Sequence, residues 1–226
     1  GTEANNLAII GRALAKERYK KGAKIITTIG EHASVDGPLE MLRKMGFTVA
    51  KIPTVGGEID MDALAKELTR DVILVTMMMI NNETGALYDT AAVAKMMKAR
   101  SPEALLHVDA TQSYLKIPFT KAKCGADMIT ISSHKIEGPK GVGALVVDEA
   151  VMRSKGLAPL TLGGGQEGGM RSGTENVPGI AAFGEAVRIG SAALHERYSL
   201  LCELQRYLIE KIENEAKDIA SEEKPL

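Results

Sequence analysis

The stretch ADMITISSHKIEGPKGVGALVV, residues 126–147, combines a strand pattern with reactive side chains. It holds two short apolar runs, residues 127–131 and 143–147, and between them lie two serines, a histidine, a lysine and a turn of glycines and proline. Short apolar runs that end at turn residues are typical of buried strands. The pattern therefore predicts a strand whose carboxyl end carries Lys135 into a tight, glycine-lined loop.

Lys135 is the residue of this stretch that carries chemistry. A lysine beside the edge of a sheet can be withdrawn from water, which lowers its pKa and makes its amine a nucleophile able to form a Schiff base. A solvated lysine that simply follows a strand has the same local sequence. The choice between these two interpretations depends on the rest of the chain.

The composition is that of an ordinary globular protein. The chain has 226 residues, a formal net charge of −1, 45% hydrophobic residues and 4% aromatic residues. The balanced charge and the few aromatics argue against binding to nucleic acid, and no apolar run approaches the roughly 18 to 20 residues of a membrane span. Two cysteines are too few for a disulfide framework or a zinc site, and they indicate a reducing, cytoplasmic location.

Short apolar runs and helical periodicity alternate along the chain. Besides the two strands above, strands are predicted at residues 24–28, 47–52, 72–79 and 105–108. Helices are predicted at residues 7–20 after a cap within 2–6, at 38–45, 60–68 and 90–99, and throughout 177–226. Asp60 is the expected N-cap of the third helix. His107 is expected to be structural, and the methionines of residues 77–79 are expected to fill the core.

Strands that are apolar without interruption and alternate with helices imply a mostly parallel sheet covered by helices on both faces. The predicted fold class is therefore α/β, with three layers in the order α/β/α. No internal repeat, low-complexity tract or linker interrupts the pattern, so residues 1–226 are expected to form one domain.

Polar clusters follow four of the predicted strands. They are Glu31-His32, Asn81-Asn82-Glu83, Asp109 with Gln112, and the run from Ser132 to Lys135. Ligands of open α/β sheets bind outside the carboxyl ends of the strands, so we expect these clusters to meet in one pocket. The histidines lack the spacing of metal ligands, and no G-x-S-x-G elbow indicates a serine hydrolase.

The residue types in this pocket suit pyridoxal phosphate. That cofactor needs a lysine for a Schiff base and a carboxylate that keeps the ring nitrogen protonated, so that the ring accepts electrons from a substrate carbanion. It also needs hydroxyl and backbone donors for its phosphate, which the start of a helix supplies. Lys135, Asp109 and the serines beside Lys135 meet these needs.

Six segments strengthen this interpretation through a resemblance. In chain order they are TEANN, EH, NNETG, HVDATQS, SSHKIEGPKGVGAL and GGGQEGGMRSGTEN. Their order and spacing resemble the cysteine desulfurases of the NifS/IscS-like branch of the class V aminotransferase superfamily, from Gly1 to about Asn176. The resemblance implies the large domain of a pyridoxal phosphate enzyme of fold type I. It also implies conversion of L-cysteine to L-alanine, with sulfur transferred to an enzyme cysteine as a persulfide for iron–sulfur cluster or thiolation pathways.

The resemblance implies a role for each matching residue of the pocket. Lys135 would form the Schiff base, Asp109 would pair with the pyridine nitrogen, and His32 would stack on the ring and serve in proton transfer. Asn82 and Gln112 would contact the oxygen side of the ring. Each has a simpler structural alternative: a helix cap for His32, a turn for Asn82 or Asp109, and a loop hydrogen bond for Gln112.

Other matching residues are implied to hold the phosphate: Gly1, Thr2, Ser132 and His134. Ser133 matches a position of the motif that varies, and loop hydrogen bonding is its alternative. Thr174 would reach the phosphate bound by the other subunit of a homodimer. The family also implies a sulfur-acceptor or scaffold protein as a partner.

The chain departs from the family pattern in residues needed for turnover. The nucleophilic cysteine of the family lies on a mobile loop beyond the RSGTEN segment, and the arginine for the substrate carboxylate also belongs to that region. Cys124 and Cys202 match neither context, and Cys202 is expected to be a small buried hydrophobe of a long helix. We therefore expect a large domain truncated at both ends, inactive by itself. The alternatives are another class V enzyme, such as an aminotransferase or selenocysteine lyase, or a non-catalytic module.

Overall fold

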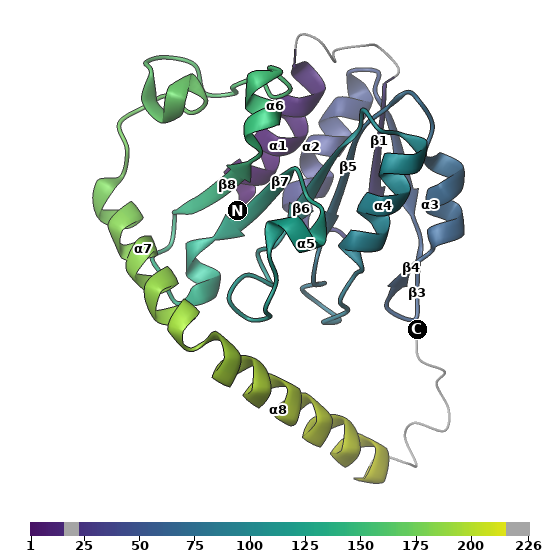
Figure 1. The fold of residues 1–226 in the computed structure, drawn as a ribbon, viewed down its shortest axis with the longest axis vertical. Helices are drawn as coiled ribbons and strands as arrows, with labels where there is room; N and C mark the ends of the chain where they lie inside the picture. The colour runs from purple at the N-terminus through teal and green to yellow at the C-terminus, as the bar shows by residue number, and fades with distance from the viewer. Residues whose placement is uncertain (16–22, 216–226) are drawn as a thin grey trace.

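A computed structural model describes residues 1–15 and 23–215, and in them six strands form one mostly parallel sheet (Figure 1). The strand order is β2-β1-β5-β6-β7-β8, and only β7 and β8 pair antiparallel. The strands are β1 (Lys24–Thr28), β2 (Thr48–Ile52), β5 (Val72–Met78), β6 (Leu105–Asp109), β7 (Met128–Ser132) and β8 (Gly143–Val147). The predicted α/β class with a mostly parallel sheet is confirmed.

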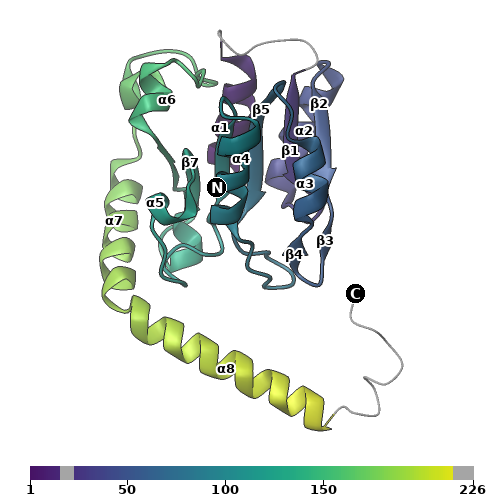
Figure 2. The ribbon, with the colours of Figure 1, turned by 45° about the vertical axis from the view of Figure 1, so that its right-hand side comes forward.

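Helices cover both faces of the sheet (Figure 2). One face packs against α1 (Thr2–Leu14), α2 (Ala33–Lys44) and α6 (Glu149–Arg153). The other packs against α3 (Met61–Glu67), α4 (Thr90–Arg100), α5 (Lys121–Cys124) and α7 (Val177–Ala192). These two apolar clusters, one on each side of the strands, give the three expected layers.

Strand β5 shows why the strands are apolar without interruption. All seven of its residues are buried. Ile73 and Leu74 belong to the apolar cluster under α1 and α2, whereas Val75 and Met77 belong to the cluster under α3 and α4. A strand in the middle of a covered sheet has no solvent face, so both sets of side chains are apolar. The methionines of residues 77–79 lie in this core, as predicted.

Local capping sets several helix boundaries. Oδ1 of Asp60 accepts a hydrogen bond from the backbone N–H of Ala63 at 2.8 Å, so the predicted N-cap of α3 is confirmed. The helix predicted to start at Pro38 begins at Ala33 instead, because the side chain of His32 caps it. The first helix starts at Thr2, earlier than expected, and the part of that prediction within residues 16–22 lies outside the described residues.

Some short elements carry too little pattern to be predicted. Strands β3 (Thr54–Val55) and β4 (Glu58–Ile59) form a two-stranded hairpin, and each strand has only two residues. Two short 3₁₀ turns, Ser133–Ile136 and Gln166–Gly169, were also not predicted. The first of these turns carries Lys135 and is therefore part of the site described below.

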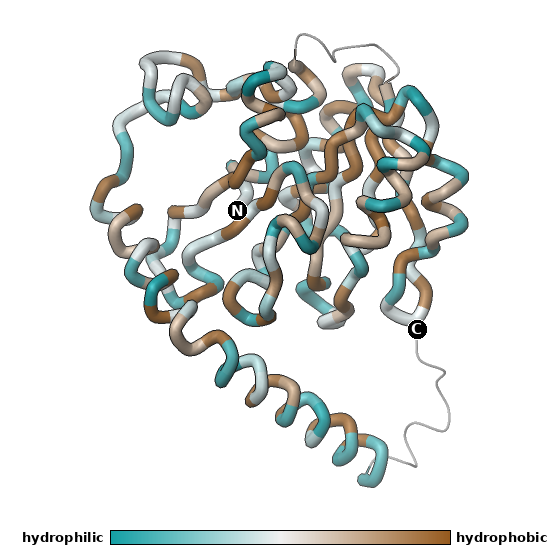
Figure 3. The backbone as a smooth tube through the Cα atoms, viewed as in Figure 1, coloured by the Kyte–Doolittle hydropathy of each residue, from teal (hydrophilic) through white to brown (hydrophobic). Residues whose placement is uncertain are grey.

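The long helix α8 (Leu194–Glu215) extends away from the sheet. Apolar residues recur along it (Figure 3), yet none of its residues is buried. Cys202 is only partly buried, so the prediction of a buried cysteine in this helix is wrong. The reason is that the described part of the chain covers little of its apolar stripe: Leu201, Leu204 and Leu208 are 47%, 54% and 58% exposed.

Candidate functional site

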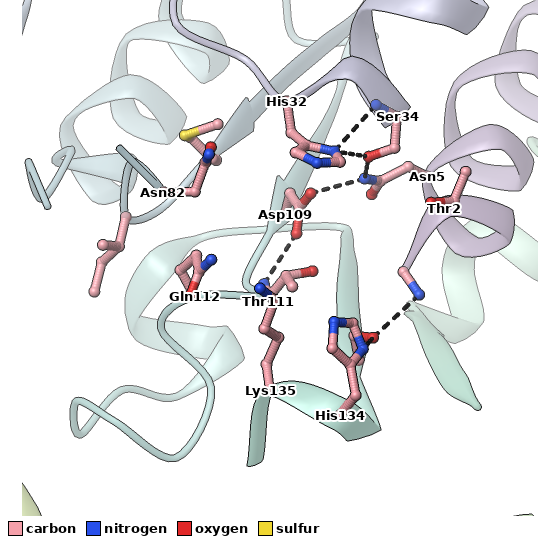
Figure 4. A pocket seen from close by; sticks show the side chains of 14 residues that line it. Thr2, Asn5, His32, Ser34, Asn82, Asp109, Thr111, Gln112, His134 and Lys135 are labelled. Atoms are coloured by element: carbon pink, nitrogen blue, oxygen red, sulfur yellow. Dashed lines mark hydrogen bonds between the residues drawn. The ribbon is translucent and has the colours of Figure 1, made fainter. Parts of the chain in front are cut away.

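A cavity of about 290 Å³ lies at the carboxyl ends of the central strands (Figure 4). Its walls come from the start of α1, the start of α2 and the segments that follow β5, β6 and β7. All four polar clusters that were expected to meet contribute to it, through His32, Asn82, Asp109 with Gln112, and the Ser132–Lys135 run. Parallel pairing of β5, β6 and β7 brings these strand ends to one edge.

Asp109 is the buried acid of this cavity. It is the last residue of β6, and its side chain is held from two directions. Asn5 donates from Nδ2 to Oδ2 at 2.7 Å, and the backbone N–H of Thr111 donates to Oδ1 at 2.9 Å. Because each carboxylate oxygen has a donor, the carboxylate is fixed in orientation at the cavity wall.

His32 both caps a helix and lines the cavity. Its Nδ1 lies 3.1 Å from the backbone N of Ser34 and 2.8 Å from the Oγ of Ser34. The structural alternative, a helix-capping histidine, is therefore present in the molecule. It does not compete with a role in the site, because capping uses only one ring nitrogen and the ring still lines the cavity.

Lys135 extends into the cavity from the 3₁₀ turn that follows β7 (Figure 4). Its side chain is exposed, so of the two interpretations of its surroundings the solvated one describes it here. The turn is tight: a Cβ added at Gly138 would lie 2.1 Å from the Oγ of Ser133. Glycine at this position therefore lets the turn close on Ser133, which lies two residues before Lys135.

The cavity has a second, hydroxyl-rich end at the start of α1. Thr2 and Ser132 line it, and the Oγ of Ser132 lies 2.9 Å from Nδ1 of His134. No side chain caps the first turn of α1, so its backbone N–H groups remain available to an anion. Partial burial and the positive charges nearby, that of Lys135 first, lower the pKa of His134. This end of the cavity suits a phosphate.

The side-chain amides of Asn82 and Gln112 also line the cavity. Gln112 accepts a hydrogen bond from the Nζ of Lys116 at 2.8 Å. The turn after β5 is made by Asn81, whose Oδ1 accepts from the backbone of Glu83 and whose Nδ2 donates to the carbonyl of Gly30. Because Asn81 holds the turn, Asn82 is left exposed at the cavity.

Two of the predicted site residues do not line the cavity. Ser133 is fully buried within its turn, and its Oγ has no hydrogen-bond partner among the described residues. Thr174 is exposed on the loop before α7. Its neighbours Gly173 and Glu175 line an adjoining hollow of about 550 Å³, which shares Thr2, Ser132 and His134 with the cavity.

Several wall residues were not assigned a role from the sequence: Asn5, Ser34, Met78, Ile80 and Thr111. Asn5 lies within the TEANN segment, about one helical turn after Thr2, so helical spacing places both on one side of α1. Ser34 follows His32 by two residues and Thr111 follows Asp109 by two. Proximity in sequence to an assigned residue was the available signal for these three.

Glu31 lies behind the cavity wall and is buried. Its Oε1 accepts from the hydroxyl of Thr28 at 2.6 Å and from the backbone N–H of Met78 at 3.1 Å, whereas Oε2 has no partner among the described residues. Burial raises the pKa of Glu31 to about 8. This acid is therefore largely protonated at neutral pH.

Within residues 1–15 and 23–215, no group of histidine, cysteine and acidic side chains is arranged to hold a metal ion. Over the same ranges, no helix is long and apolar enough to cross a membrane.

The sequence and the fold are similar to those of known proteins. Among curated proteins, cysteine desulfurase IscS 1 of Archaeoglobus fulgidus is 42% identical over 212 residues, covering 93% of this chain and 53% of that protein. A solved structure of a NifS-like protein matches with a TM-score of 0.87 and 36% identity, covering 94% of this chain and 57% of that one. A structure described as SspA in complex with cysteine matches with a TM-score of 0.75 and 35% identity, covering 83% and 52%.

The chain spans about half the length of the curated relatives that it matches. The family described as Aminotransferase class-V matches residues 1–221, which is nearly the whole sequence. The chain therefore belongs to the class-V aminotransferase family.

Proposed function

We propose that this chain is the cofactor-binding part of a pyridoxal phosphate-dependent cysteine desulfurase, which converts L-cysteine to L-alanine and transfers the sulfur to an enzyme cysteine. The observation that carries the proposal is the meeting of Lys135, Asp109 and the uncapped start of α1 around one cavity. The desulfurase relatives support the reaction, and the neighbour solved with cysteine supports the substrate.

The residues present fit the proposed cofactor at both ends of the cavity. The amine of Lys135 and the fixed carboxylate of Asp109 line one part of the wall, and the hydroxyls of Thr2 and Ser132 line another. When bound, pyridoxal phosphate supplies a ring that accepts electrons from the substrate carbon. A protonated ring nitrogen is needed for this, and the negative charge of Asp109 favours it.

Each proposed role follows from the position of the side chain. Lys135 is an exposed amine that can reach a carbonyl group in the cavity. From the same position the amine can also donate or accept a proton. His32 contributes a flat ring held by its contacts with Ser34, which suits stacking. Asn82 and Gln112 offer amide donors to ring oxygens from the opposite wall.

The phosphate is proposed to lie against the start of α1. The backbone of Gly1 and Thr2 and the side chains of Thr2, Ser132 and His134 surround that place. Ser133 is buried away from it, so its proposed contribution is to hold the turn that carries its neighbours. Thr174 is proposed to reach the phosphate held by a second copy in a homodimer, because it is exposed beside the adjoining hollow.

Neither cysteine of the chain lies at this cavity. Cys124 is buried on α5 and Cys202 is partly buried on α8, and neither lines the cavity. We therefore propose that the sheet and its helices form a single domain which binds the cofactor, and that these 226 residues alone release no sulfide or alanine from L-cysteine. A sulfur acceptor would be a separate protein partner of the whole enzyme.

Reconstitution tests the cofactor site. After incubation with pyridoxal phosphate and reduction with borohydride, mass spectrometry should find one cofactor adduct, on the peptide containing Lys135. Lys135→Ala should lose it, and Lys140→Ala, which removes an exposed lysine of the same loop, should keep it. An adduct on Lys116, or one spread over many lysines, would contradict the proposal. Release of sulfide from L-cysteine by the reconstituted chain would contradict the proposed inactivity.

A further inference from the structure

A chain of hydrogen bonds runs from Asp109 to His32 through Asn5 and Ser34 (Figure 4). The amide Nδ2 of Asn5 lies 2.7 Å from Oδ2 of Asp109 and 2.9 Å from the Oγ of Ser34. The same Oγ lies 2.8 Å from Nδ1 of His32. Asn5 comes from α1 and Ser34 from α2, so the chain joins two helices and the sheet beneath the cavity.

The direction of each hydrogen bond follows from the groups involved. The carboxylate of Asp109 can only accept, so the atom of Asn5 that faces it must be the amide nitrogen. That nitrogen has two hydrogens, and its second one is donated to the Oγ of Ser34. The Oδ1 of Asn5 is buried without a partner among the described residues, which is the cost of using both amide hydrogens in this way.

The hydroxyl of Ser34 must then point its own hydrogen at His32. Its oxygen accepts from the amide of Asn5, and Nδ1 of His32 lies within hydrogen-bond distance at 2.8 Å to receive its hydrogen. The backbone N–H of Ser34 also points at this nitrogen from 3.1 Å and can only donate. Two donors aimed at one ring nitrogen exclude a hydrogen from it.

We propose that Asn5 and Ser34 are positioning residues that hold His32 as the neutral tautomer with its proton on Nε2. His32 then presents an N–H donor on the ring edge away from Ser34. The negative charge of Asp109 polarises Asn5 and strengthens each later bond of the chain. The inference deepens the proposed function of the same site. The tautomer itself does not depend on that function, and only the use of the Nε2–H donor rests on it.

Nitrogen NMR of the chain without cofactor tests the tautomer directly. In protein labelled with ¹⁵N-histidine at pH 8, where an ordinary histidine of pKa about 6.5 is neutral, long-range ¹H–¹⁵N correlations identify the protonated ring nitrogen. His32→Asn assigns the signals among the four histidines. The expected pattern for His32 is a protonated Nε2 and an unprotonated Nδ1.

Two variants interrupt the chain of hydrogen bonds at different points. Ser34→Ala removes the hydroxyl donor, and Asn5→Asp replaces the donating amide with an acceptor, which draws the Ser34 hydrogen away from His32. Both should give a mixture in which Nδ1–H becomes detectable. Asn6→Asp is the matched control, because it makes the same change on the same helix at a residue whose side chain donates to the carbonyl of Thr2 and, in the described part of the chain, to no residue of the site.

The outcomes separate this inference from a general loss of structure. His107 is buried between the hydroxyls of Thr76 and Thr130, so its unchanged signals show that a variant is folded. Should Asn5→Asp lose those signals, Ser34→Ala decides alone. A wild-type His32 with its proton on Nδ1, or folded variants with an unchanged tautomer, would overturn the inference. A chain that fixes the tautomer but forms no adduct at Lys135 would overturn the proposed function instead.

Discussion

Glu31 is buried beside the cavity, and its position makes the stability of the protein depend on pH. Burial raises its pKa from 4.5 to about 8. Below pH 4.5 the folded and unfolded chains both carry the proton. Between pH 4.5 and 8 the unfolded chain gives it up while the folded chain keeps it, so the free energy of unfolding falls as pH rises. Above pH 8 the loss is complete.

We expect Glu31→Gln to remove this dependence. The glutamine oxygen can accept from Thr28 and Met78 as the carboxyl oxygen does, and the amide is neutral at every pH. Urea unfolding at pH 5, 6, 7 and 8 gives the free energy of unfolding of each protein. The value for the variant minus that for the wild type should rise by on the order of 3 to 5 kcal/mol from pH 5 to pH 8. Parallel pH profiles for the two proteins would contradict the assignment of a buried, neutral Glu31.

Residue types and strand-end positions were sufficient to predict Lys135, Asp109 and His32 at one site, because parallel strands end at the same edge. They were not sufficient for Asn5 and Ser34. Whether those two side chains meet depends on how α1 and α2 pack against each other, and no local pattern encodes that packing. The exposure of Lys135 was left open for a similar reason, since it is set by the surrounding elements.

At the scale of elements, the turn after β7 depends on a close contact between Gly138 and Ser133. A Cβ at residue 138 would lie 2.1 Å from the Oγ of Ser133. We expect Gly138→Ala to destabilise the protein by about 1 to 3 kcal/mol, as overpacking does. Gly184→Ala is the control within α7, because a Cβ there meets nothing within 4 Å and no proline follows, and it should stabilise by up to about 1 kcal/mol.

A double-mutant cycle measured by urea unfolding locates the cause. The Oγ of Ser133 is buried and has no hydrogen-bond partner in residues 1–15 and 23–215, so Ser133→Ala should cost little, and it removes the atom that clashes. Adding Ser133→Ala to Gly138→Ala should therefore recover most of the lost stability. Additive effects of the two substitutions would show that the clash is not the reason for glycine at residue 138.

Elements with strong periodicity were predicted and short ones were not. The unbroken apolar run of β5 predicted a strand that is covered on both faces, and all of its residues are buried. The two-residue strands of the β3–β4 hairpin and the 3₁₀ turn of Ser133–Ile136 are too short to show any period. The start of α2 was placed too late because its cap is a histidine, which is not among the usual capping residues.

At the scale of the whole molecule, the sheet with its flanking helices and the helix α8 differ in how they are held. The residues of the two apolar clusters lie between the sheet and α1 to α7, whereas α8 has no buried residue. Leu64 on α3 is 2% exposed, and Leu204 on α8 is 54% exposed. The stability of the described structure should therefore come from the sheet and the helices that cover it.

The same substitution at these two leucines tests this division. Leu64→Ala removes a buried side chain and should lower the free energy of unfolding by about 2 to 5 kcal/mol. Leu204→Ala should change it by less than about 0.5 kcal/mol, because its side chain loses little contact. Leu204→Ala should instead reduce the binding of a hydrophobic dye, since it removes part of an exposed apolar stripe. Equal losses of stability at both positions would mean that α8 packs against the sheet in solution, and the division drawn from burial would then be wrong.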